Sequence, residues 1–134
     1  MRNSNYRLPQ EWYRSGGEDA ISAEILLKEG APHRIICFHC QQAAEKYLKG
    51  FLLLRKQKYP KSHDLLEIIT LCQEVEPDFA SIKESGAILN PYYIESRYFA
   101  TTSEAYSRED SQKAIENATT IIEFVKSRSP EVVD

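Results

Sequence analysis

The residues best suited to chemistry form a short stretch in the last third of the chain, where tyrosines flank an arginine. Tyr93 and Arg97 are four residues apart, so on a helix the ring and the guanidinium would share one face. A guanidinium binds phosphate or carboxylate through two parallel hydrogen bonds. The alternative is structural: Arg97 pairs with an acid such as Glu45 or Glu95, and the tyrosines pack at the edge of the core. These residues alone leave both interpretations open.

A second candidate is a basic run from Lys46 to Lys61 that contains no acidic residue. Its cations are Lys46, Lys49, Arg55, Lys56, Lys58 and Lys61, with Tyr47 and Tyr59 among them. Cations interleaved with aromatic rings are typical of sites that hold RNA or a nucleotide phosphate. The same cations would also stabilise the end of a helix without any ligand. Because 17 basic and 20 acidic residues give a net charge of −3, any contact with nucleic acid must be local.

Two further constellations favour structural interpretations. His33, Cys37 and Cys40 would share one helical face, as zinc ligands can, but no paired ligand motif accompanies them, so we expect no metal. Ser62-His63-Asp64 contains the residue types of a catalytic triad, but consecutive side chains point in different directions. We expect a helix cap there instead. The Gly-rich loops that bind nucleotide phosphates are absent from the sequence, so no cofactor is predicted.

Helical periodicity dominates the sequence and predicts an all-α, antiparallel up-and-down bundle of about five helices. We expect helices over residues 11–29, 32–57, 64–76, 79–99 and 107–128, with a break in the fourth at Asn90-Pro91. Proline lacks an amide hydrogen and disfavours helix in the preceding residue, which accounts for that break. Residues 1–134 would form a single domain with its core in 11–128, and residues 129–134 would fray.

The second predicted helix is expected to be the central one, because two adjacent stripes give it a wide apolar face. The stripes are Ile36, Cys40, Ala43, Tyr47 and Phe51, and beside them Phe38, Ala44, Leu48 and Leu52. The third helix would direct Leu65, Ile68, Ile69, Cys72 and Val75 inward, and the last would direct Ala114, Ala118, Ile121 and Val125 inward. Asp64 and the Ser107–Asp110 pair are predicted to cap the third and last helices.

We expect the chain to be cytoplasmic, for three reasons given by the sequence. No apolar run approaches the length needed to cross a membrane, and the first residues are polar, unlike a signal peptide. Three cysteines are an odd number in a chain long enough to fold without disulfides, which favours a reducing compartment.

Several segments, taken in their order, resemble the HEPN family (higher eukaryotes and prokaryotes nucleotide-binding). The matching pieces are QQAAEKYLK at 41–49, SHDL at 62–65, the stretch from Tyr93 to Tyr98, and the spacing of Asp110, Ala114 and Ala118. The resemblance covers about Trp12 to Val125. It implies a five-helix bundle that commonly forms homodimers. It also implies pairing with a minimal nucleotidyltransferase, for which the bundle is a substrate-binding subunit or the toxin of a toxin–antitoxin pair.

Other HEPN proteins are metal-independent ribonucleases that use an Arg-x4-6-His motif. Arg97 matches the arginine of this motif, but Thr102, Ser103 and Glu104 stand where the histidine should fall. None of these three side chains transfers protons near neutral pH as imidazole does. The resemblance therefore implies a chain without catalytic residues.

The sequence thus predicts a non-catalytic, homodimeric HEPN-like bundle that binds a nucleotide or substrate as the partner of a separate nucleotidyltransferase. Arg97 would hold a phosphate or carboxylate, with Tyr93, Lys46 and His63 near the same cleft. One alternative is a ribonuclease toxin, acting on RNA, with a degenerate Arg-x4-6-His motif. The other is a purely structural dimer module.

Overall fold

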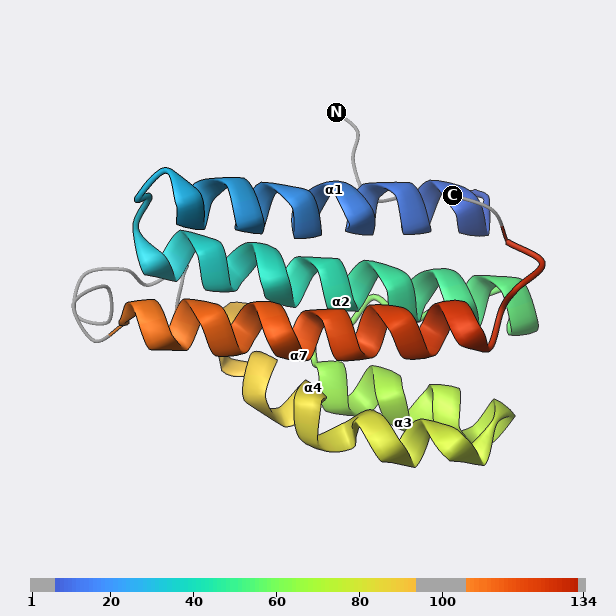
Figure 1. Cartoon of the computed structure of the whole chain (residues 1–134). Coiled ribbons are helices and arrows are strands. Elements are labelled where there is room, and N and C mark those ends of the chain that lie inside the picture. Colours follow the sequence, from blue (N-terminus) through green and yellow to red (C-terminus); the bar gives the residue numbers. More distant parts are fainter. Residues whose placement is uncertain (1–6, 94–105, 133–134) are drawn as a thin grey trace.

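The structure is a computed structural model that describes residues 7–93 and 106–132. Within these residues it contains α1 (Pro9–Lys28), α2 (His33–Lys56), α3 (Leu65–Val75), the 3-10 helix η1 (Pro77–Ile82), α4 (Lys83–Leu89) and α7 (Arg108–Ser127). The described part of the chain has no β-strand. The predicted all-α bundle is therefore confirmed (Figure 1).

The long helices α1, α2 and α7 lie side by side, and the shorter α3 and α4 pack below them in the view of Figure 1. Helix α2 contacts α1, α3, α4 and α7, as its wide apolar face predicts. All of its first predicted stripe is buried, and so is the second stripe apart from Phe38, which is half-buried. Helix α2 is therefore the centre of the core.

The segment after Cys72 differs from the prediction. Val75 was expected in the core but is 36% exposed, because α3 ends there and the chain turns into η1. Phe79 and Ile82 of η1 are buried in its place. The helix predicted over 79–99 thus begins as a 3-10 helix, and α4 ends at Leu89, next to the predicted break.

Two predicted helix starts are confirmed by their hydrogen bonds. The Asp64 carboxylate accepts bonds from the amides of Leu66 and Glu67 at the start of α3. Ser107 and Asp110 form a reciprocal capping box at the start of α7. Such caps satisfy amide groups that have no partner within the helix, so a local signal suffices to predict them.

Residues 129–132 differ from the expected frayed tail. Ser129 is buried, and its hydroxyl lies 2.7 Å from the hydroxyl of Tyr13 in α1. Arg55 of α2 donates a hydrogen bond to the carbonyl of Arg128 at 2.7 Å and pairs with Glu131. The segment after α7 therefore runs back across the ends of α1 and α2 (Figure 1), held by partners far away in the sequence.

The buried phenol of Tyr13 predicts a loss of stability in strong alkali. Burial raises the pKa of Tyr13 from about 10 to about 12, so folding favours the neutral phenol. The resulting stabilisation, about 2 to 3 kcal/mol, is complete below pH 10 and lost as the pH rises to 12. We expect Tyr13→Phe to show a flatter pH dependence of the free energy of unfolding than the wild type, measured by urea denaturation between these pH values. Parallel curves would contradict this account.

Candidate functional site

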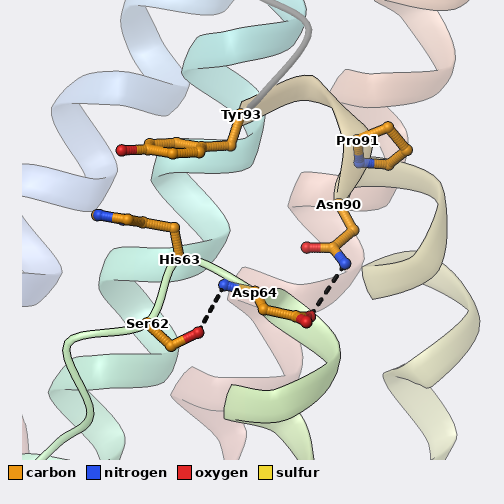
Figure 2. Close-up of a pocket in the computed structure, with 6 residues that line it drawn as sticks. All are labelled: Ser62, His63, Asp64, Asn90, Pro91 and Tyr93. Carbon is orange, nitrogen blue, oxygen red and sulfur yellow. Dashed lines mark hydrogen bonds between the residues drawn. The ribbon is translucent and has the colours of Figure 1, made fainter.

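A pocket of about 370 Å³ opens where the start of α3 meets the end of α4. It is lined by Ser62, His63, Asp64, Asn90, Pro91 and Tyr93, all shown in Figure 2. These residues belong to two short segments, the loop before α3 and residues 90–93 after α4, where the chain is helical again from Pro91. The structure thus brings together His63 and Tyr93, two of the four residues predicted to bind a ligand.

His63 is held on one face and one edge but remains open to solvent. Its ring stacks nearly parallel on that of Tyr93, with centroids 4.2 Å apart (Figure 2). Its Nδ1 lies 2.8 Å from Oε2 of Glu45, while the side chain is 46% exposed. An ionised carboxylate only accepts hydrogen bonds, so the proton of the neutral ring belongs on Nδ1. Nε2 is then left with its lone pair to contact a ligand.

The carboxylate that holds His63 is itself buried in the central helix. Glu45 is 4% exposed, and its Oε2 also accepts a hydrogen bond from the ammonium of Lys49 at 3.0 Å. Gln41 donates to the other oxygen of Glu45 at 3.2 Å and to the carbonyl of His63 at 3.1 Å. Helix α2 therefore positions both the ring and the backbone of His63.

The opposite wall of the pocket is held by Asn90. Its amide nitrogen donates to the Asp64 carboxylate at 3.0 Å, and its carbonyl oxygen accepts from the amide of Leu65 at 2.7 Å. The same Asp64 oxygen caps α3, so its negative charge is balanced by the positive end of the helix. These bonds join the end of α4 to the start of α3 and fix the shape of the pocket.

The arrangement can act in two chemical ways. A protonated His63 would attract an anionic group, and a neutral one could accept a proton through Nε2. Tyr93 and Pro91 supply apolar surface for a planar ligand. Among the described residues no lysine or arginine lines this pocket, so there the positive charge for a phosphate would come from His63.

Of the other two predicted ligand-binding residues, the structure places Lys46 alone, and that lysine lies outside the pocket. Lys46 follows Glu45 in the sequence, but its ammonium lies 2.8 Å from Asp19 and donates to Ser15 at 2.9 Å, both in α1. His39 contacts the same Asp19 carboxylate at 2.7 Å. Lys46 thus belongs to a separate cluster between α1 and α2. Arg97 is outside the described residues.

The candidate zinc ligands have other surroundings. His33 lies 2.8 Å from the hydroxyl of Ser111, and both Cys37 and Cys40 are buried. Burial raises the pKa of the Cys40 thiol far above its usual range, which disfavours the thiolate that zinc binds. Residues 7–93 and 106–132 contain no group of three potential ligands close enough to hold a metal.

Gln41, Glu45 and Lys49 form the network behind His63, and none of the three was predicted as a ligand-binding residue. They are spaced by four residues, so they form one polar line along the otherwise apolar face of α2. Buried polar groups need partners. Polar residues that interrupt such a face therefore predict a buried network, but not the loop that completes it.

The fold and the matching segments define the class of the protein. The model of the HEPN domain family matches residues 9–128, nearly the whole chain, so this chain belongs to the HEPN family. No helix among the described residues is both long and apolar enough to cross a membrane.

Two solved structures share the fold over almost their full length. The crystal structure of TT1696 from Thermus thermophilus is 28% identical, with a TM-score of 0.79, and the match covers 91% of this chain and 98% of that one. ST0689, described as an archaeal HEPN homologue, is 25% identical with a TM-score of 0.75, covering 92% and 98% respectively. A comparison with curated proteins found no match.

Proposed function

We propose that this HEPN protein is the nucleotide- or substrate-binding partner subunit of a separate minimal nucleotidyltransferase. The proposal makes the chain a non-catalytic cytoplasmic homodimer, and in a toxin–antitoxin pair it would be the toxin. The observation that carries it is His63, oriented by the buried Glu45 and stacked on Tyr93 at the mouth of a pocket.

The geometry supports recognition of a group that is both planar and anionic. In its protonated form His63 can donate a hydrogen bond from Nε2 to a phosphate oxygen, because Nδ1 is already paired with Glu45. Arg97 follows Tyr93 by four residues in the sequence, and we propose that its guanidinium supplies the second cation for the phosphate. The stacked rings would lie beside the base or another planar part of the ligand.

Calorimetric titration with ATP tests the binding role, with the chain alone and in complex with the nucleotidyltransferase. We expect His63→Ala to weaken binding by about tenfold or more, the usual effect of losing a hydrogen bond to a charged group. His39→Ala is the matched control, because His39 also pairs with a carboxylate but lies outside the pocket. Absence of binding by both the chain and the complex would refute the role.

The partner is tested separately by purifying the tagged chain from its native cells and identifying the co-purifying proteins by mass spectrometry. Recovery of a small nucleotidyltransferase in near-equal amount is the expected result. Recovery of this chain alone would count against the partner-subunit role.

The Glu45–His63 pair favours a second candidate function, that of a metal-independent ribonuclease. A histidine oriented by a carboxylate can act as a general acid or base, and His63 would supply the imidazole missing after Arg97. Under this hypothesis the purified chain cleaves RNA in the presence of EDTA, and His63→Ala lowers the rate about 100-fold or more. Arg97→Ala should abolish cleavage and His39→Ala should leave it unchanged. A wild-type chain that leaves RNA intact would eliminate this candidate.

A further inference from the structure

A second pocket, of about 200 Å³, lies at the C-terminal end of α2. It is lined by Leu52, Lys56, Lys58, Tyr59, Pro60 and Leu71 and shares no residue with the pocket at His63. Its walls come from the last turns of α2, the loop that follows, and the middle of α3. The basic run of the sequence therefore does form part of a concave surface.

The two lysines of this pocket have no carboxylate within 4 Å among the described residues. Lys46 and Lys49 of the same run, in contrast, each pair with an acid. Lys56 is in the last turn of α2, where a cation interacts favourably with the negative end of the helix dipole, so its presence needs no ligand. The helix dipole does not explain Lys58, which comes after the left-handed cap residue Gln57. Two such cations at one pocket would attract an anionic group.

The remainder of the pocket is apolar and aromatic. Leu52 is fully buried, and Leu71 of α3 packs against the core at the other side. The ring of Tyr59 is set edge-on against Trp12, with centroids 4.9 Å apart, so its position is fixed before any ligand arrives. Cations beside a fixed aromatic ring are the combination that binds the bases and phosphates of single strands.

We propose that this pocket is a second binding site, for a nucleobase together with its phosphate. The base would lie against Tyr59 and Leu71, and Lys56 and Lys58 would contact the phosphate. Glu67 and Glu74 lie one helical turn before and after Leu71 on α3. Because their negative charges would repel a phosphate, the phosphate is expected on the α2 side of the pocket. The ligand is either a free nucleotide or a nucleotide within single-stranded RNA, which share this chemistry.

Two probes distinguish the sources: AMP, titrated by calorimetry, and a fluorescent oligouridylate of ten nucleotides, titrated by anisotropy. The double variant K56E/K58E should bind the effective probe about tenfold more weakly, with a shallower dependence of affinity on salt. Binding of AMP that the double variant loses identifies a free-nucleotide site. Binding of the oligouridylate alone, lost in the same way, identifies an RNA site.

The control is Lys61→Glu, a single substitution of the same kind in the same basic run but outside the pocket, with half the charge change of the double variant. It should change affinity less than threefold, because an exposed charge outside the pocket is screened by solvent and salt. Both titrations are also made in the His63→Ala background, in which the first pocket is impaired, so failure of the first pocket and of this one are separable. The proposal is overturned if the wild type binds neither probe, if K56E/K58E binds like the wild type, or if Lys61→Glu weakens binding equally.

Discussion

Replacing Glu45 with alanine is expected to lower the free energy of unfolding by about 3 to 5 kcal/mol. The ammonium of Lys49, whose side chain is only 5% exposed, would remain buried without a counter-charge. His63 and Gln41 would lose the same acceptor. Urea denaturation of the variant and the wild type at neutral pH measures the difference.

Two controls separate the buried pair from an ordinary ion pair. Glu109 and Lys113 form an exposed pair with the same four-residue spacing, 3.7 Å apart, so Glu109→Ala should cost less than about 1 kcal/mol. The double variant Glu45→Leu/Lys49→Met removes both charges and should recover most of the stability. A cost for Glu45→Ala no larger than that of Glu109→Ala would show that Lys49 can reach solvent.

Glu45 is also expected to affect ligand binding, because its carboxylate orients His63. Without Glu45 no carboxylate fixes the proton on Nδ1 of His63 or the plane of its ring. We therefore expect ATP binding at the first pocket to weaken in the folded Glu45→Gln variant, which retains the shape of the side chain and one hydrogen-bond acceptor. The second pocket should not respond.

The second large effect is expected for Gly50→Ala in the C-terminal half of α2. An added Cβ would lie 2.7 Å from the ring of Tyr13 and 2.9 Å from Cβ of Trp12. Both side chains are fully buried, and Tyr13 is held by Ser129, so neither can yield cheaply. We expect the free energy of unfolding to fall by about 2 to 3 kcal/mol, the usual cost of overpacking a core.

Gly17→Ala is the matched control, since it makes the same change within α1. There the nearest heavy atom to the added Cβ is the hydroxyl oxygen of Tyr47, at 3.4 Å. Alanine favours helix over glycine, so this variant should gain up to about 1 kcal/mol. Thermal and urea denaturation of both variants would show shifts of opposite sign, and a gain in stability for Gly50→Ala would contradict the packing of α1 on α2 described above.

The sequence by itself determined the positions of α1, α2, α3 and α7 and the central role of α2. Apolar residues at helical spacing, from Ile36 to Phe51, give the buried face, and short-range hydrogen bonds at Asp64 and Ser107 give two helix starts. These features depend on residues within one or two turns of each other. For the same reason the ordered segments were sufficient to indicate the HEPN family.

Only the tertiary structure decided which polar residues meet. Glu45 and Lys46 are adjacent but point roughly 100° apart around α2, so one contacts His63 and the other contacts Asp19 of α1. Local spacing predicts neither the stacking of His63 on Tyr93 nor the hydrogen bond between Ser129 and Tyr13. These contacts join residues far apart in the chain, and they depend on how each helix is rotated and where each loop returns. Periodicity predicts which face of a helix is buried, but not what it is buried against.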